Sequence, residues 1–226
     1  MWGIALATKL RRFTSLANAI DMLVNNRLAL LSPKTWQDRN DTRFLETFLE
    51  STGYKSVFAA CFTRASETYH HWGVFGRANE GVCIEFNGEA LLGPLDNRHG
   101  YYFRDVAYTR LSHLREMSEI SVYDLPFMKR YGFKDEREFR LIYASKYANV
   151  SHYVDVDRSM VNRIIFNPWI PAANVDALKS VLRSIKGWRD IYLEKSSLID
   201  NAQWEKACRK VDEFEFMLSD TPENQL

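Results

Sequence analysis

Two acidic residues and an arginine alternate over a short stretch of the chain, at Glu136, Glu138 and Arg140. If the stretch is a strand, these three side chains point to one face of it. The opposite face then carries a mostly apolar set, which predicts a core face: Arg137, Phe139, Leu141 and Tyr143. The charged face must meet open water or a polar cleft, because unpaired charges are costly to bury. In a cleft, a rigidly held carboxylate would suit an enzyme that acts on a sugar or phosphate ligand.

Two more polar groups fall where expected strands end. Arg11 and Arg12 precede Thr14, at the junction of a strand with a helix. A guanidinium there can bind a phosphate, helped by the partial positive charge of the helix N-terminus. Thr63 ends an apolar run, so its hydroxyl can face a cleft. The plainer alternatives are an exposed basic pair and an ordinary threonine at a strand end.

Three aromatic residues, Tyr69, Trp72 and Phe75, are spaced three apart. This spacing places them on one side of a helix, and Trp72 is large enough to wall a pocket for a planar ring. Aromatic stripes more often belong to a plain core, so both interpretations stay open.

The composition sets limits on the function. The chain has 226 residues, of which 46% are hydrophobic, so it should bury a sizeable core. Its net charge of +1 gives no sign of a nucleic-acid-sized basic surface. Three widely spaced cysteines indicate reduced thiols in a cytoplasmic protein. We find no metal-ligand spacing, glycine-rich phosphate loop, signal core or membrane span, and expect no metal and no membrane partner.

Hydrophobic periodicity predicts the elements that must position these residues. The expected strands cover residues 6–13, 28–31, 57–62, 82–86, 103–108, 136–143, 161–166 and 188–193. The expected helices follow a cap at Thr14 or Ser15, carry Phe44 to Leu49 before Gly53, run over 111–123, and carry the apolar faces of 175–185 and 204–217. We expect one α+β domain over residues 1–218, with a mixed, mainly antiparallel sheet flanked by helices, and a frayed tail over 219–226.

An ordered series of segments resembles an uncharacterised bacterial family, domain of unknown function twenty-nine seventy-one. The segments are Leu10–Phe13, Leu31–Trp36, Cys61–Thr63, Trp72–Phe75, Gly81–Phe86, Glu136–Arg140 and the turn Ile164–Pro168. The resemblance runs from about Leu10 to Ile199. The family usually has Asn-Asp-Pro after the second strand and a histidine with a tyrosine after the tryptophan. Here Gln37-Asp38-Arg39 and Val74-Phe75 stand in those places, so roles for those side chains are not implied.

More distantly, the chain resembles ADP-ribosyltransferases. Arg12, Thr63 and Glu138 look like the Arg, Ser/Thr and Glu series of those enzymes, and Glu136-Arg137-Glu138 is similar to their Glu-x-Glu element. The resemblance implies an ADP-ribosyltransferase-like fold and NAD as a substrate, with no metal and no nucleophilic side chain. It also implies a bacterial toxin or phage-defence context.

The same resemblance implies roles for individual residues. Glu138 would hydrogen-bond the ribose and stabilise the positive charge that forms as the glycosidic bond breaks, while Glu136 would orient the acceptor. The implied NAD-binding residues are Arg12 at the pyrophosphate, Thr63 ordering the pocket, and Tyr69, Trp72 or Phe75 stacking on nicotinamide.

Two other functions remain open. A nuclease-type defence protein could use Arg12, Glu138 and Arg140 around a phosphate, although the near-neutral charge disfavours it. A nucleotide-sensing or protein-binding module without catalysis would instead use Glu136, Glu138 and Arg140 as a structural ion-pair network. The sequence determines neither the acceptor nor the oligomeric state.

Overall fold

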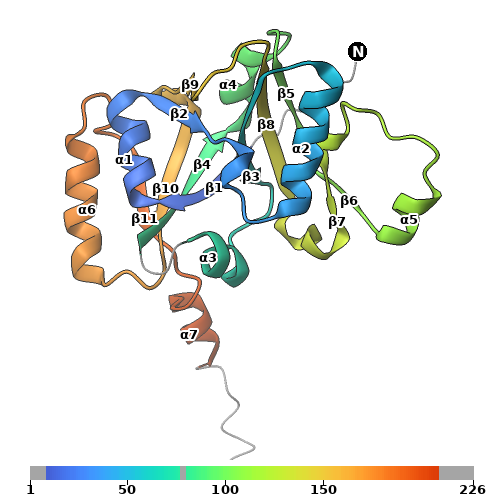
Figure 1. The fold of residues 1–226 in the computed structure, drawn as a ribbon. Coiled ribbons are helices and arrows are strands. Elements are labelled where there is room, and N and C mark those ends of the chain that lie inside the picture. Colours follow the sequence, from blue (N-terminus) through green and yellow to red (C-terminus); the bar gives the residue numbers. More distant parts are fainter. Residues whose placement is uncertain (1–8, 77–79, 209–226) are drawn as a thin grey trace, which may run out of the picture.

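The structure is a computed structural model that describes residues 9–76 and 80–208, and Figure 1 shows its ribbon. The strands are β1 (Lys9–Ser15), β2 (Arg27–Leu30), β3 (Ser56–Thr63), β4 (Gly81–Asn87), β5 (Tyr101–Asp105), β6 (Ala107–Thr109), β7 (Met128–Arg130), β8 (Glu138–Ser145), β9 (His152–Asp155), β10 (Val161–Phe166) and β11 (Tyr192–Lys195). The α-helices are α1 (Leu16–Asn25), α2 (Arg39–Thr52), α3 (Tyr69–Phe75), α4 (Gly88–Leu92), α5 (Leu111–Glu116), α6 (Ala172–Ser184) and α7 (Ala202–Cys208). The 3-10 helices are η1 (Pro33–Thr35), η3 (Gly93–Leu95), η4 (Leu125–Phe127), η5 (Tyr131–Glu136) and η6 (Arg158–Met160).

A seven-stranded sheet forms the centre of the described part of the chain, in the order β11-β10-β4-β1-β3-β8-β5. The pair β10–β11 is parallel and the other pairs are antiparallel. Two small sheets, β2–β9 and β6–β7, lie beside it. The expected α+β class, with a mixed and mainly antiparallel sheet, is therefore confirmed.

Helices cover both faces of this sheet (Figure 1). One core contains Leu23 of α1 and Leu182 of α6, packed with Leu10 and other inward residues of the sheet. Smaller clusters on the opposite face contain Leu45 of α2 and Trp72 of α3. The sheet is thus the middle of three layers, and its two faces have different neighbours.

The strands β1 and β3 meet at a narrow seam. They share one register pair, Arg11 with Thr63, whereas β1 pairs with β4 all along from Lys9 to Ser15. The seam divides the sheet into a half containing β11, β10, β4 and β1 and a half containing β3, β8 and β5. Polar side chains at the seam therefore lie between two well-formed halves of the sheet.

Capping residues explain several element boundaries. Ser15, one of the two expected caps, accepts a hydrogen bond from the amide of Asn18 at the start of α1. Asp38 caps α2 in the same way, and Gly53 ends this helix in a left-handed conformation at φ 68°. The strand expected over 161–166 matches β10.

Other boundaries were wrong. The strand expected over 136–143 begins only at Glu138, because Arg137 takes a left-handed φ of 43° and Glu136 ends a 3-10 helix. The segment 103–108 forms two strands rather than one, since β5 ends at Asp105 and β6 begins at Ala107. The helix expected over 111–123 ends at Glu116.

The last expected strand, 188–193, starts later, at Tyr192. The short strands β7 and β9 were not predicted. Residues 6–8 of the first expected strand, 209–217 of the last helix and 219–226 of the expected tail lie outside the described residues.

Candidate functional site

A buried guanidinium joins α2 to β8. Arg140, which is 1% exposed, donates from Nε to Glu138 Oε1 at 2.7 Å and from Nη2 to Asp41 Oδ2 at 2.6 Å. Its Nη1 donates to the carbonyl of Pro126 at 2.9 Å, and Trp36 lies 5.0 Å from it as a cation–π partner. Burial would lower the pKa of Arg140, but Glu138 and Asp41 outweigh it and raise the pKa, so the guanidinium stays charged.

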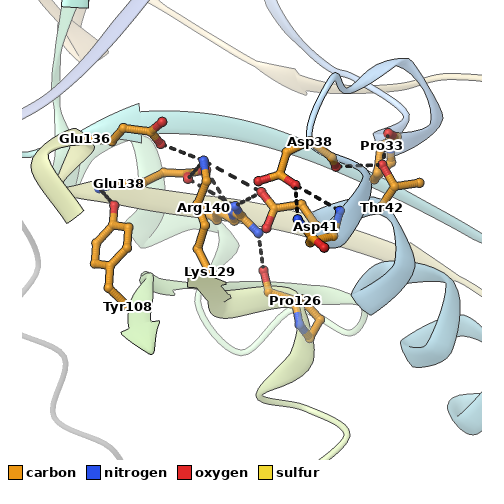
Figure 2. A network of polar contacts seen from close by, with 11 residues as sticks. Pro33, Asp38, Asp41, Thr42, Tyr108, Pro126, Lys129, Glu136, Glu138 and Arg140 are labelled. Atoms are coloured by element: carbon orange, nitrogen blue, oxygen red, sulfur yellow. Dashed lines mark hydrogen bonds and ion pairs between the residues drawn. The ribbon is translucent and has the colours of Figure 1, made fainter. Parts of the chain in front are cut away.

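An ammonium on a side chain that is 10% exposed completes this cluster. Lys129 of β7 donates from Nζ to Glu136 Oε2 at 2.6 Å and to Glu138 Oε2 at 3.1 Å, and it lies 3.7 Å from Asp41 Oδ2. Figure 2 shows Lys129 and Arg140 between Asp41 on one side and Glu136 and Glu138 on the other. We call Asp41, Lys129, Glu136, Glu138 and Arg140 the Arg140 network.

The Arg140 network has more carboxylates than cations, with three against two among the described residues. Burial would raise the pKa of Glu138, but Arg140 and Lys129 outweigh it and lower the pKa to about 2. Burial, together with repulsion from Glu138, raises the pKa of Asp41 and of Glu136 although their cations act to lower it. Glu138 is therefore the carboxylate held most firmly in its ionised form, and Asp41 and Glu136 take up protons more readily.

The sequence places these groups through simple local rules. Asp41 lies four and seven residues before Leu45 and Phe48, so the three share the buried face of α2. Glu138 and Arg140 lie two apart on β8 and share a face of the sheet, as predicted. Glu136 precedes the strand. The left-handed turn at Arg137 directs the side chain of Glu136 onto Lys129.

Three polar residues form a row across the seam. Arg11 is in register with Thr63, and Thr63 is in register with Glu138. In-register residues on neighbouring strands share a face, so Arg11, Thr63 and Glu138 lie side by side on the face covered by α2 and α3. The Thr63 hydroxyl donates to the carbonyl of Glu136 at 2.6 Å and accepts from the amide of Ala65 at 3.0 Å.

Arg12 points to the opposite face, because neighbouring residues of a strand alternate. Its Nη1 donates to the carbonyl of Cys61 at 3.3 Å, and burial lowers the pKa of its guanidinium. The structure therefore does not bring Arg12 together with Glu138 and Thr63. Arg11, its neighbour, occupies the position on their face.

A second ion network extends this row away from the seam. Glu85 of β4, 2% exposed, accepts from Arg11 Nε and from Arg163 Nη2, both at 3.0 Å. Lys9 lies 3.8 Å from it, and Glu194 of β11 pairs with Arg163. Burial would raise the pKa of Glu85, but Arg163, Arg11 and Lys9 outweigh it and lower the pKa. We call these residues the Glu85 network: Lys9, Arg11, Glu85, Arg163 and Glu194.

The three predicted aromatic residues lie on α3 but differ in exposure. Trp72 is fully buried, donates from Nε1 to Glu67 Oε2 at 3.0 Å, and packs edge-on against Phe13. Tyr69 and Phe75 are 68% and 36% exposed. Trp72 thus occupies a core position, while Tyr69 and Phe75 leave ring surface accessible.

Sequence reasoning missed several members of these networks. Asp41 has a readable signal, since its spacing from Leu45 and Phe48 places an acid on an apolar helix face. Glu85 has one too, because it is the charged residue in the buried strand Gly81–Asn87. Lys129 has none, because it lies in a three-residue strand that hydrophobic periodicity cannot detect.

Two surface cavities lie away from the row. One of about 240 Å³ is lined by Arg104, Asp105, Met128 and their neighbours, and one of about 660 Å³ lies between α6 and β11. Neither is lined by Arg11, Thr63 or Glu138. Within residues 9–76 and 80–208, no group of three or more His, Cys, Asp and Glu side chains could hold a metal ion, and no helix is long and apolar enough to span a membrane.

Comparisons with known proteins show similarity to a sequence family and to a solved structure. A profile of a family of proteins of unknown function (DUF2971) matches residues 71–141, which confirms the expected resemblance to that family over this segment. The segment contains Lys129, Glu136, Glu138 and Arg140. The structure is also similar to DarT of Thermus sp. 2.9 in complex with carba-NAD+, with a TM-score of 0.44 and 10% sequence identity over 84% of this chain and 96% of that chain. No curated protein matches the sequence.

Proposed function

We propose that this protein cleaves the nicotinamide–ribose bond of NAD and passes the ADP-ribosyl group to an acceptor, as ADP-ribosyltransferases do. The observation that carries the proposal is the row Arg11, Thr63 and Glu138 across the seam, which places an arginine, a hydroxyl and a glutamate on one face in the order of the sequence resemblance. Arg11 takes the position that the sequence analysis gave to Arg12.

Each residue of the row has a chemical task in this proposal. As the glycosidic bond breaks, nicotinamide leaves with the bonding electron pair and becomes neutral, and positive charge remains on the ribose. A carboxylate that stays ionised is suited to stabilise this charge, and the pKa of about 2 gives Glu138 that property. Arg11, with Lys9 and Arg163 beside it, would bind the pyrophosphate.

The acceptor would bond to the ribose C1′ atom and lose a proton. Glu136 would orient the acceptor and take that proton, because its raised pKa makes it the stronger base of the two glutamates. Of the three aromatic residues, Tyr69 and Phe75 have the accessible rings for stacking on nicotinamide.

A second candidate is a nucleotide-sensing or protein-binding module without catalysis. The observation that favours it is the pairing of both Glu138 oxygens, since Arg140 and Lys129 occupy them and the residue is 6% exposed. In that function the Arg140 network would only hold α2 and β7 on the sheet.

Nicotinamide release from NAD by the purified protein separates the two candidates. The comparison is between the wild type, Glu138→Gln, and the control Glu46→Gln, which changes an exposed glutamate of the same helix as Asp41. Circular dichroism and thermal unfolding establish that each variant is folded. We expect Glu138→Gln to lower kcat by about 100-fold or more and Glu46→Gln to leave it unchanged.

Two results would contradict the enzymatic proposal. One is release by Glu138→Gln at the wild-type rate. The other is no release by the wild type in the presence of cell extract as a source of acceptor, together with no thermal shift on adding NAD. Loss of thermal stability in Glu138→Gln without any turnover in the wild type would favour the structural module.

A further inference from the structure

The backbone carbonyl of Glu136 is held from two elements. Thr63 of β3 donates its hydroxyl to this oxygen at 2.6 Å, and Nε2 of His71 in α3 lies 3.4 Å from it. The side chain of the same residue reaches Lys129 at 2.6 Å. The position of the Glu136 carboxylate therefore depends on how firmly its own carbonyl is fixed.

The contacts of His71 determine which ring nitrogen carries hydrogen. A carbonyl oxygen can only accept, so Nε2 is the protonated nitrogen. The hydroxyl of Thr68 accepts from the amide of His71 at 3.1 Å and lies 2.7 Å from Nδ1, so its own hydrogen goes to Nδ1. The carbonyl of Glu136 thus selects the tautomer, and the Thr68 hydroxyl supplies the donor that the unprotonated Nδ1 then needs.

The ring of His71 is also held in place by packing. It is 1% exposed and stacks on Phe13, with ring centroids 5.2 Å apart and planes 10° apart. Burial lowers the pKa of His71 more than the carbonyl of Glu136 raises it, so the ring is neutral. Both nitrogens of the neutral ring then have partners, and the imidazole acts as a fixed donor.

The turn after Glu136 needs such support. Arg137 has a φ of 43°, a left-handed conformation that costs free energy in a residue with a side chain. Its carbonyl accepts from the amide of Arg64 at 3.0 Å. Hydrogen bonds to the carbonyls of Glu136 and Arg137 therefore hold the turn that brings Glu136 and Glu138 onto the ammonium of Lys129.

We propose that His71 is a positioning residue, which fixes the Glu136 carbonyl and thereby sets the two glutamates side by side on Lys129. Its effect on catalysis rests on the function proposed above, whereas its effect on the glutamates does not. The role belongs to a histidine of α3 that touches neither carboxylate.

The experiment compares His71→Phe, which keeps a stacking ring and loses the donor, with His71→Gln, whose amide nitrogen can reach the position of Nε2. The first readout is the pH titration of the Glu136 and Glu138 carboxyl carbons by NMR in protein labelled with 13C-glutamate, assigned with Glu136→Gln and Glu138→Gln. The second readout is the kcat and KM of nicotinamide release from NAD. The control His70→Phe changes the exposed neighbour of His71.

We expect His71→Phe to shift the Glu136 titration toward that of an exposed glutamate and to lower kcat by about 10- to 100-fold with KM nearly unchanged. His71→Gln should restore both readouts, and His70→Phe should change neither. A wild-type Glu136 titration in His71→Phe, or an equal shift in His70→Phe, would overturn the inference. If the wild type releases no nicotinamide, the proposed function fails but the titration still decides the role of His71.

A second pair of variants covers the case in which His71→Phe does not fold. Thr68→Val removes the hydroxyl that donates to Nδ1 of His71 and caps α3, and Thr68→Ser keeps both contacts. We expect the Glu136 titration to shift in Thr68→Val and to stay at its wild-type position in Thr68→Ser. Identical titrations in the two variants would overturn the inference.

Discussion

The Arg140 network and the Glu85 network lie on the same face of the sheet, on either side of the seam between β1 and β3. Each is centred on one charge that is almost fully buried. Their surroundings differ, because the other members of the Arg140 network have side chains 4–11% exposed, whereas those of the Glu85 network range from 13% to 58%. The first network is enclosed and the second is reached by water.

The charge balance of the two networks is opposite. Among the described residues, the Arg140 network has three carboxylates for two cations, and the Glu85 network has three cations for two carboxylates. In the proposed function, the excess of acid would face the ribose and the neighbouring excess of base would bind the pyrophosphate of one dinucleotide. The comparison also predicts which substitutions should matter most.

The largest effect should follow from removing the enclosed cation. Arg140→Met leaves Asp41 and Glu138 as buried carboxylates, so we expect the free energy of unfolding to fall by about 3–5 kcal/mol. The control Arg163→Met should cost much less, because Arg11 and Lys9 still pair with Glu85 and water can reach the site. Urea denaturation at neutral pH measures both, and equal losses would show that enclosure is not what distinguishes the networks.

The next effect concerns acid. The pKa of Glu138 in the folded protein, about 2, lies below its ordinary value of 4.5. Its ionised form therefore stabilises the fold above about pH 4.5, and this contribution of about 3 kcal/mol is lost as the pH falls toward 2. Asp41 and Glu136 act in the opposite sense, since their raised pKa values favour protonation of the folded protein.

Glu138→Gln should therefore lose less stability than the wild type between about pH 4.5 and 2. Urea denaturation at a series of pH values gives the two curves, with Glu46→Gln as the control. Parallel curves for the wild type and Glu138→Gln would mean that Glu138 does not have a depressed pKa.

A third effect tests whether Arg11 or Arg12 binds the pyrophosphate of NAD. If NAD is the substrate, Arg11→Met should raise the KM for NAD about 10-fold or more, since a charged hydrogen bond to phosphate is lost. Arg12→Met should leave KM near the wild-type value, because Arg12 lies on the other face and bonds to the carbonyl of Cys61. Initial rates of nicotinamide release measure both, and the reverse result would return the pyrophosphate to Arg12.

The sequence predicted the strands of the central sheet better than the site that they carry. The strand expected over 57–62 lies within β3, because a continuous apolar run in a buried strand has a clear pattern. Periodicity could not predict which of Arg11 and Arg12 shares a face with Thr63 and Glu138. Adjacent residues on a strand face opposite sides of the sheet, so a shift of the register by one residue exchanges the two arginines. The register depends on partner strands that are distant in sequence.

The sequence predicted only part of the Arg140 network, because the rest of it depends on the tertiary fold. Glu138 and Arg140 share a face because both lie within β8, and this follows from alternation alone. Glu136 reaches the same cluster through a left-handed turn at Arg137, which the sequence does not indicate, because arginine rarely adopts that conformation. Lys129 comes from a strand outside the main sheet, and only the tertiary fold brings it to the acids.

A smaller effect should follow from removing the surplus acid. Glu136→Gln changes the Arg140 network from three carboxylates to two, which balances its two cations. We therefore expect a change in the free energy of unfolding of no more than about 1 kcal/mol at neutral pH, because the lost bond to Lys129 is offset by relief of repulsion from Glu138 and Asp41. Urea denaturation tests this, and a loss as large as that of Arg140→Met would contradict the surplus of acid.

The smallest effect should come from the outermost cation of the Glu85 network. The Lys9 side chain is 58% exposed and lies 3.8 Å from Glu85, whose carboxylate keeps Arg11 and Arg163 when Lys9 is removed. Lys9→Met should therefore cost less than about 1 kcal/mol, as exposed ion pairs do. The difference from the wild type should vanish in about 1 M salt, where charges are screened over about 3 Å. Urea denaturation of the wild type and Lys9→Met at low and high salt measures this difference in the free energy of unfolding. A difference that persists at high salt would mean that the Glu85 network, like the Arg140 network, is enclosed and not reached by water.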